Sequence, residues 1–278
     1  MTLVSIVIPT FNNGRDIVAT MESVLTQDFD DFEVVIADHS STDDTLEKLK
    51  LFSGDSRVRI LSTDAGGGAL RNWNRVTAEA SGKYLKLVCG DDILDPQCLT
   101  RQIVPFLENE NVVLVASPRR IIDEAGATMM EKRGLAGLTG LMAGTVAIRK
   151  TVKAGTNIFG EPASVMVRRE ELMNAGGWDG QFPYLIDQTT YTRVLLRGDF
   201  FAVPEVLGAF RVSGSQWSVQ LVAQQSQQAI AFHEWFREQN PDVVSAFDTY
   251  RGNAMARFNA LGRRAVYAGL RLRSRLAR

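Results

Sequence analysis

Short apolar runs alternate with longer amphipathic stretches through the first half of the chain. The apolar runs have the length and continuity of strands buried in a parallel sheet: VSIVIP (4–9), FEVVIAD (32–38), VRIL (58–61), KYLKLV (83–88) and NVVLVAS (111–117). Helix-like segments lie between them, near residues 15–26, 42–52, 69–80 and 96–108. This alternation predicts an α/β fold with a doubly wound, mostly parallel sheet and helices on both faces.

Two adjacent acids, Asp91 and Asp92, fall on the loop after the fourth predicted strand. Asp95 followed by Pro96 predicts a helix start immediately beyond this loop, with a capping acid before a proline at the first helical position. In open α/β sheets, ligands bind beyond the carboxyl ends of the strands. The pair is therefore predicted to lie at the binding edge.

Polar groups follow the other strands at the same edge. Asn12 is one of them, in the stretch Pro9-Thr10-Phe11-Asn12-Asn13 after the first strand, and DAGGGALRN (64–72) follows the third. Asp38 ends the second strand and precedes, by a full turn, a capping box predicted from Ser41 and Asp44. That separation favours ligand contact over a turn role for Asp38.

The glycines around Gly67 offer a weaker signal. A glycine-rich loop at a helix N-terminus can cradle a phosphate. This loop has neither the G-x-G-x-x-G nor the P-loop spacing, and a tight turn explains the glycines equally well.

Composition limits the classes of function. The chain has 278 residues, 45% of them hydrophobic, so it can bury a large core. Its formal net charge of −1 provides no overall field to recruit nucleic acid, and no nucleic-acid partner is expected. The two cysteines, Cys89 and Cys98, fit neither a zinc site nor a disulfide framework, which favours a reducing compartment.

The location follows from the absence of a targeting pattern. MTLVSIVIPTF is short, lacks a basic leader and resembles a first strand more than a signal peptide. No run approaches the roughly 18 to 20 apolar residues that span a bilayer. We expect a cytoplasmic protein, at most peripheral to the inner face of the membrane.

The acidic pair predicts a site for a hard divalent cation. Mg²⁺ and Mn²⁺ prefer oxygen ligands and usually take one or two carboxylates together with phosphate oxygens. Two neighbouring buried carboxylates repel each other, and a cation relieves that repulsion. Solvated loop acids are the simpler alternative for Asp91 and Asp92.

Several segments in order together resemble glycosyltransferase family 2, whose members have the GT-A fold. They are VSIVIPTFNN, VVIADHSSTDDT, NWNRVTAEASGKYLKLVCGDD and GGWDGQFPYLIDQTTYTRVLLRGDF, within residues 3 to 218. The resemblance implies transfer of a sugar from a nucleotide-sugar, most often a UDP-sugar, to an acceptor hydroxyl, with inversion at the anomeric carbon.

The resemblance also implies roles for residues of the first half. Pro9, Thr10 and Asp38 would contact the nucleotide, with Asp38 at the base. Arg71 and Asn72 would lie near the ribose and the diphosphate.

The metal motif departs from the family pattern, which often has Asp-x-Asp-Asp. Here the register gives Cys89-Gly90-Asp91-Asp92, so the first carboxylate is missing and Asp91 falls on the usual metal-ligand position. We expect Cys89 to be a small core residue, because a thiolate ligand would favour softer metals.

In the second half, Asp187 matches the family's general base. Taken alone, an acid in the first turn of a predicted helix is an ordinary helix-start residue. A single-displacement transfer needs a base to take the proton of the acceptor hydroxyl. Arg71 or Arg211 would help to stabilise the departing diphosphate. Glu161 and Pro162 are further candidates for contact with the donor sugar or the acceptor.

The division expected along the chain is a catalytic domain over 1–218, followed by a helical region over 219–278. The domain would comprise a nucleotide-binding half (1–117) and an acceptor-side half (118–218). After Asp248 the chain has eight arginines and no acid. A basic amphipathic helix here could lie on anionic lipid, or be solvated or face another subunit. The oligomeric state is left open.

By analogy, the acceptor would be a carbohydrate or glycolipid in surface polysaccharide or glycolipid assembly. A nucleotide-sugar-binding module without catalysis is the alternative function. Trp178 and Trp217 could stack on sugars, although burial is the commoner fate of an indole.

Overall fold

The computed structural model describes residues 2–213 and 224–276, with side chains through Leu261. The first half contains β1 (Val4–Thr10), α1 (Ile17–Leu25), β2 (Phe32–Asp38), α2 (Thr45–Leu49), η1 (Lys50–Phe52), β3 (Val58–Ser62), α3 (Gly68–Ala78), β4 (Tyr84–Leu87), β5 (Ile93–Leu94), α4 (Cys98–Glu108) and β6 (Val112–Ala116). The remainder contains β7 (Arg119–Ile122), β8 (Thr128–Arg133), β9 (Gly140–Ala143), α5 (Gly144–Ala154), η2 (Pro162–Ser164), β10 (Val165–Arg168), α6 (Arg169–Asn174), α7 (Ile186–Leu195), β11 (Asp199–Ala202), β12 (Gly208–Arg211), α9 (Gln225–Gln239) and α10 (Ala246–Leu276).

The main sheet is mostly parallel, which confirms the predicted fold class. Its strand order is β3-β2-β1-β4-β10-β6-β11-β9. The pairings among β3, β2, β1 and β4 are parallel, as is that of β6 with β11, whereas β10 and β9 pair antiparallel to their neighbours. A smaller sheet has the order β5-β12-β7-β8. All the strands predicted from apolar runs are present.

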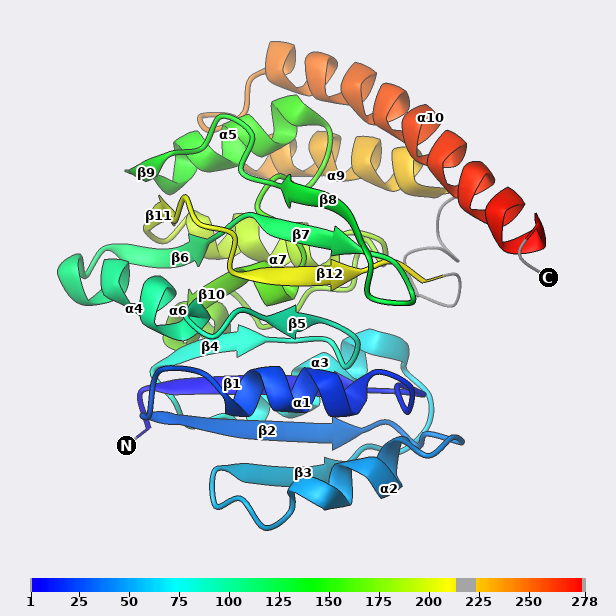
Figure 1. Cartoon of the computed structure of the whole chain (residues 1–278). Coiled ribbons are helices and arrows are strands. Elements are labelled where there is room, and N and C mark those ends of the chain that lie inside the picture. Colours follow the sequence, from blue (N-terminus) through cyan, green and yellow to red (C-terminus); the bar gives the residue numbers. More distant parts are fainter. Residues whose placement is uncertain (1, 214–223, 277–278) are drawn as a thin grey trace.

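The main sheet separates two hydrophobic cores because side chains alternate between the faces of each strand. In β1, Ile6 packs in the core covered by α1 and α4, whereas Val7 packs in the core covered by α3, α5 and α7. Figure 1 shows α1 in front of the sheet and α3 behind it. Burial on both faces explains why the strand sequences are continuous apolar runs.

Strand register brings the carboxyl ends of the first strands to one edge. Thr10 pairs with Asp38, and Asp38 pairs with Ser62. The arrows of β1, β2 and β4 point the same way in Figure 1, toward the loops that carry the predicted site residues. The fold thus collects these loops as the sequence predicted.

Both helix-start predictions were wrong in detail. The N-cap of α2 is Asp44, which makes no side-chain capping bond, and Ser41 instead donates its hydroxyl to Asp38. A hydrogen bond to a carboxylate is stronger than one to a neutral group, which explains the switch. α4 begins at Cys98, because the Asp95 carbonyl accepts the Cys98 N–H in a turn.

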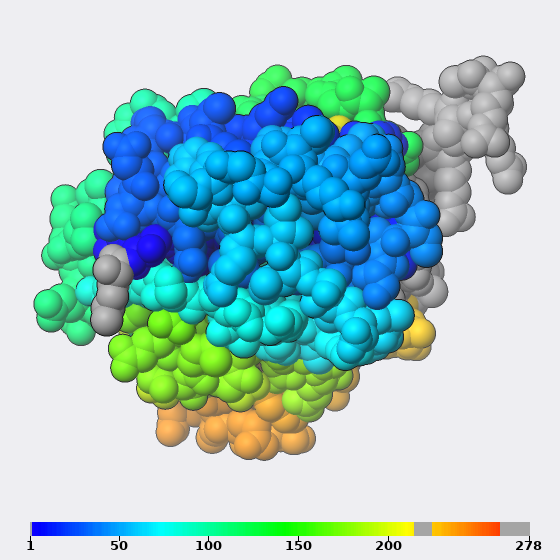
Figure 2. Space-filling model, turned by 90° about the horizontal axis from the view of Figure 1, so that it is seen from below, coloured from blue at the N-terminus to red at the C-terminus, as the bar shows by residue number. Residues whose placement is uncertain are grey.

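The last two helices pack on the second half of the chain. α10 contacts α9 and α5, and the buried Asp248 of α10 accepts a hydrogen bond from Arg149 Nε at 2.6 Å. Seen from the β3 edge in Figure 2, this helical region lies at the far margin of the molecule. Within the described residues, no helix combines the length and apolarity needed to span a bilayer. The proposed division at residue 218 stays a prediction.

Candidate active site

At the ends of β1 and β2, Asp38 is held by hydrogen bonds within the protein. Its side chain is buried, and its carboxylate accepts the Ser41 N–H at 3.0 Å and the Ser41 hydroxyl at 2.5 Å. The Thr10 hydroxyl lies 3.5 Å from Oδ1. The neighbouring Pro9 is buried within β1, in register with Ala37. This edge is therefore fixed before any ligand binds.

Asn12 connects the loop after β1 to the loop after β2. Its backbone has a positive φ of 52°, its N–H donates to Ser41 Oγ, and its Oδ1 accepts the Thr42 N–H at 2.9 Å. The adjacent Phe11 is 57% exposed, and its ring centroid lies 6.2 Å from that of His39. An exposed aromatic ring beside Asp38 offers a flat surface for a base, a feature that the sequence analysis did not assign.

The side-chain amide of Asn72, in α3, forms its hydrogen bonds within the protein. Its Nδ2 donates to the carbonyls of Ala37 at 2.9 Å and Thr10 at 3.3 Å, and its Oδ1 accepts the Thr63 hydroxyl at 2.8 Å. The side chain thus ties together the carboxyl ends of three strands. Its predicted contact with a nucleotide stays a prediction.

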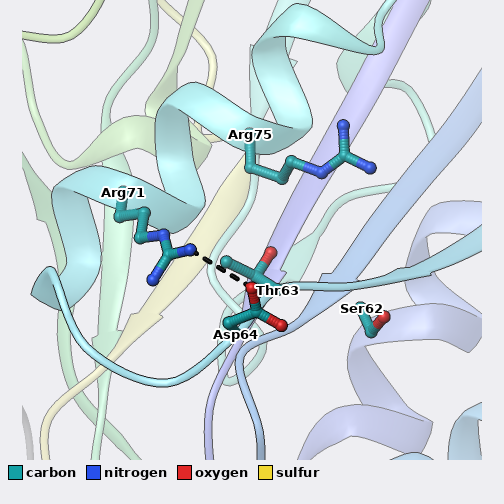
Figure 3. Close-up of a pocket in the computed structure, with 5 residues that line it drawn as sticks. All are labelled: Ser62, Thr63, Asp64, Arg71 and Arg75. Atoms are coloured by element: carbon teal, nitrogen blue, oxygen red, sulfur yellow. Dashed lines mark ion pairs between the residues drawn. The ribbon is translucent and has the colours of Figure 1, made fainter.

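The glycine loop turns the chain into α3 and sets the position of Arg71. Gly67 has a φ of +76°, and a Cβ there would lie 2.8 Å from Cδ of Arg71. Arg71 donates to the Ala65 carbonyl at 3.1 Å and pairs with Asp64 at 3.5 Å. A hollow of about 400 Å³ lies beside it and is lined by Ser62, Thr63, Asp64, Arg71 and Arg75, whose side chains are drawn in Figure 3. Glycine is required at 67, which favours the tight turn.

The acidic loop after β4 is held by Arg211 of β12. The backbone N–H of Arg211 donates to Asp92 Oδ1 at 3.2 Å, and its Nε donates to the Asp91 carbonyl at 3.0 Å. Asp92 is completely buried, and its Oδ2 has no hydrogen-bond partner among the described residues. The ligand atoms of Cys89, Asp91 and Asp92 lie within 4.8 Å of one another.

These residues fit a hard divalent cation. Burial raises the pKa of Asp92 well above its usual value, and the charge of Asp91 raises it further. A buried, unpartnered carboxylate oxygen beside a second acid is costly unless a cation binds it. Burial likewise raises the pKa of the Cys89 thiol well above its usual value, so Cys89 is a poor ligand for Mg²⁺ or Mn²⁺. Asp91 and Asp92 would hold the ion.

Asp187 lies in the first turn of α7, on a different part of the chain. Asn157 Nδ2 donates to its Oδ2 at 2.8 Å, and the Gln188 N–H donates to Oδ1 at 2.7 Å. Burial raises the pKa of Asp187 to about 7, and the charge of Glu161 adds to that rise, while both hydrogen bonds oppose it. A carboxylate with a pKa near 7 is suited to accept a proton at neutral pH.

The charges of acids from several segments reach the thiol of Cys89, which belongs to the acidic loop. After burial, the charges that raise the pKa of its thiol are those of Asp92, Asp91, Asp187 and Glu161. All of these carboxylates therefore act on one side chain, although they come from three separate segments. The predicted cation ligands and the predicted base are thus close enough for their charges to act on the same thiol.

A family model matches more than half of the chain. The model of "Glycosyl transferase family 2" matches residues 5–173, which include β1, the acidic loop and the segment of Asn157 and Glu161. The chain belongs to glycosyltransferase family 2. The family suggested by the sequence is thereby confirmed.

Two curated relatives of this glycosyltransferase are informative. The uncharacterised protein MT1568 of Mycobacterium tuberculosis (strain CDC 1551 / Oshkosh) is 30% identical over 230 residues, which cover 80% of this chain and 70% of the relative. UDP-Glc:alpha-D-GlcNAc-diphosphoundecaprenol beta-1,3-glucosyltransferase WfgD of Escherichia coli is 36% identical over 107 residues, which cover 38% of this chain and 42% of WfgD. The chain thus matches less than half of WfgD.

A solved glycosyltransferase has the same fold. Mannosyltransferase PcManGT from Pyrobaculum calidifontis, in complex with GDP-Man and Mn²⁺, superposes with a TM-score of 0.65 at 16% identity. The superposition covers 99% of this chain and 80% of that enzyme. At this identity the likeness speaks for the fold alone.

Within this family-2 chain, the sequence analysis missed two contacts near Asp187. Asn157, which holds the carboxylate, is 30 positions away in sequence. Arg119, at the start of β7, is 4% exposed and forms an ion pair with Glu161. The charge of Arg119 lowers the pKa of both Asp92 and Asp187. No local spacing predicts such long-range pairs.

Of the two tryptophans considered for stacking on a sugar, the structure describes Trp178. Trp178 is buried, and its Nε1–H donates to the Thr77 hydroxyl at 2.8 Å while its ring packs edge-on against Trp73. It is thus a core residue and not a sugar platform. Trp217 lies outside the described residues.

Proposed function

We propose that this glycosyltransferase moves a sugar from a nucleotide diphosphate sugar, with UDP as the nucleotide, to an acceptor hydroxyl with inversion at the anomeric carbon. The name of WfgD specifies UDP-Glc as its donor, which supports UDP. GDP is the competing nucleotide, because PcManGT binds GDP-Man.

One observation carries the proposal: Asp187 and the Asp91–Asp92 pair act on the same Cys89 thiol from separate segments. An inverting transfer needs a base on one side of the anomeric carbon and stabilisation of the leaving diphosphate on the other. Asp187 would accept the proton of the attacking hydroxyl. Asn157 and the Gln188 N–H would keep its carboxylate oriented for that step.

The departing diphosphate would be stabilised by residues other than Asp187. Arg71, half exposed beside the hollow at the β3 end, would contact the diphosphate. Arg211 would act by holding the acidic loop in place through the Asp91 carbonyl and Asp92. A divalent cation bound by Asp91 and Asp92 would supply positive charge to the departing diphosphate.

At the nucleotide end, the proposal assigns contacts to the edge formed by β1 and β2. Thr10, Asn12 and Asp38 would meet the base and ribose, since Thr10 and Asp38 end adjacent strands, Asn12 follows in the next loop, and hydrogen bonds hold these strand ends and loops in place. Pro9 and Asn72 would contribute by shaping these loops, and Gly67 by placing Arg71.

For the acceptor, we propose a carbohydrate or a glycolipid used in surface polysaccharide assembly. The acceptor in the name of WfgD is a sugar linked through diphosphate to undecaprenol, which supports a glycolipid.

A panel of UDP- and GDP-sugars tests the proposal, with release of nucleotide measured in Mn²⁺ buffer and donor binding measured by calorimetry. We expect slow hydrolysis of at least one UDP-sugar. Asp187→Asn should bind that donor normally and release no nucleotide, whereas the exposed Asp242→Asn should behave as wild type. Binding without release by the wild type would instead identify a non-catalytic nucleotide-sugar-binding module.

A further inference from the structure

The outward face of α10 carries an exposed apolar row. Phe247, Tyr250, Phe258 and Leu261 are 68%, 75%, 69% and 64% exposed, and Ala254 between them is also exposed. Their spacing of three or four residues, or its multiples, places them on one side of a helix. Large side chains are seldom exposed in a continuous row unless something covers them.

The opposite face of α10 packs against the rest of the protein. Ala256 and Ala260 are buried, and Asn259 Nδ2 donates to the Ala154 carbonyl at 2.9 Å. The contact with α5 is so close that a Cβ on Gly155 would lie 2.4 Å from the Ala256 nitrogen. The helix therefore cannot rotate to bury its apolar row against its own chain.

The sequence of α10 beyond Asp248 carries charge of a single sign. Beyond Asp248 the sequence contains eight arginines and no aspartate, glutamate or lysine, although the whole chain has a net charge of −1. The apolar spacing continues in the sequence at Ala265, Ala268, Leu272 and Leu276. An apolar row combined with arginines is the pattern of helices that lie in a membrane interface.

We propose that α10 binds the surface of an anionic phospholipid membrane through this row. A second copy of the chain is the other natural occupant. Two copies of α10 would bring arginines together without acids to pair with them, whereas an anionic bilayer complements both the apolar row and the charge. Lipid is therefore the occupant that the composition favours.

Binding of α10 to a membrane would also set the position of the proposed active site relative to the lipid surface. The contact with Asn259 and Ala256 fixes residues 154–155, and Asn157, two residues later, holds Asp187. Membrane binding would thus hold Asp187 at a set orientation to the lipid surface. The proposal that the apolar row of α10 binds a membrane does not depend on the proposed reaction.

Vesicle sedimentation of the full chain tests the proposal. We expect at least tenfold tighter binding to vesicles with about one third phosphatidylglycerol than to pure phosphatidylcholine. Raising NaCl from about 0.1 M to about 0.5 M should remove most of that preference. The double variant Phe258→Asn/Leu261→Asn should weaken binding by about tenfold or more.

A matched control is offered by two exposed leucines elsewhere, Leu51 (73% exposed) and Leu107 (59%). Leu51→Asn/Leu107→Asn should bind vesicles as wild type does, and both double variants should keep wild-type unfolding temperatures and donor hydrolysis in solution. Equal affinity for neutral and anionic vesicles, or no loss in Phe258→Asn/Leu261→Asn, would overturn the proposal. So would a dimer, seen by analytical ultracentrifugation without lipid, that this variant dissociates.

Discussion

Two regions lie beyond the carboxyl ends of the strands: the edge around Asp38, which we propose binds the nucleotide and call the nucleotide edge, and the acidic cluster of Asp91 and Asp92. Their buried carboxylates differ in how far hydrogen bonds from the protein satisfy them. At the nucleotide edge, Asp38 is buried but accepts hydrogen bonds from Ser41 and Thr10. In the acidic cluster, Asp92 is buried more completely, accepts the Arg211 N–H, and leaves one oxygen without a partner among the described residues. One carboxylate is satisfied by the protein, and the other is not.

This difference in hydrogen bonding distinguishes residues that stabilise the site from residues whose polar atoms are left for a ligand. Hydrogen bonds stabilise a buried carboxylate, so the nucleotide edge contributes to folding. The buried Asp92, with one unpartnered oxygen and the charge of Asp91 beside it, costs folding free energy that a bound cation would offset. Substitutions should therefore have opposite effects on stability in the two regions.

The largest effect is expected at Asp187, whose two oxygens accept hydrogen bonds but whose pKa is raised by burial and by the charge of Glu161. Asp187→Asn should lower kcat by about 10²- to 10⁴-fold, because the base is lost. Because folding raises the pKa of Asp187 from 3.8 to about 7, its carboxyl group lowers the stability of the folded protein progressively as pH rises between those two values, and the loss is complete above about pH 7. At pH 8 the variant should unfold at the same temperature as wild type or higher. Unimpaired turnover at normal donor affinity would remove Asp187 from the role.

The next effect concerns the acidic pair itself. A chelator should inhibit activity, and Asp91→Ala should weaken donor binding by at least about tenfold, because the proposed cation ligand is lost. Without metal, Asp92→Asn should not lower the unfolding temperature, whereas Asp38→Asn should. Full activity in metal-free buffer would contradict the proposal that Asp91 and Asp92 bind a cation needed for the reaction.

A smaller effect, on stability, is expected at the nucleotide edge. Asn72→Ala leaves the carbonyls of Thr10 and Ala37 and the Thr63 hydroxyl without their partner. We expect a loss of about 1–3 kcal/mol in the free energy of unfolding, measured by urea denaturation. Weakened donor binding with unchanged stability would instead indicate direct contact with the nucleotide.

The smallest effect is a change in the pH profile. With a pKa of about 7 for Asp187, kcat/KM should fall about tenfold per pH unit below that value, because the base becomes protonated. Asn157→Ala removes a hydrogen bond that lowers this pKa, so its acidic limb should move to higher pH. Asn109→Ala, in the loop before β6, is a control and should leave the profile unmoved.

Local patterns predicted some details well and others badly. The strands followed from continuous apolar runs, since burial on both faces of a parallel sheet demands them. The capping box at Ser41 failed, because Asp38 is a stronger partner than the helix terminus and its proximity depends on the turn after β2. Asn157 and the Arg119–Glu161 pair went unseen for a different reason: their partners are distant in sequence.

Residue order alone specified the α/β alternation, the family, the strand end at Asp38, the loop of Asp91 and Asp92, and the helix start at Asp187. Hydrophobic period and strand-end position are local properties, so residue order is enough to specify them. Only the tertiary structure decided which carboxylates are satisfied and which crowd around Cys89, because that depends on partners contributed by remote segments. Burial and electrostatics act through space, and chain folding alone creates those distances.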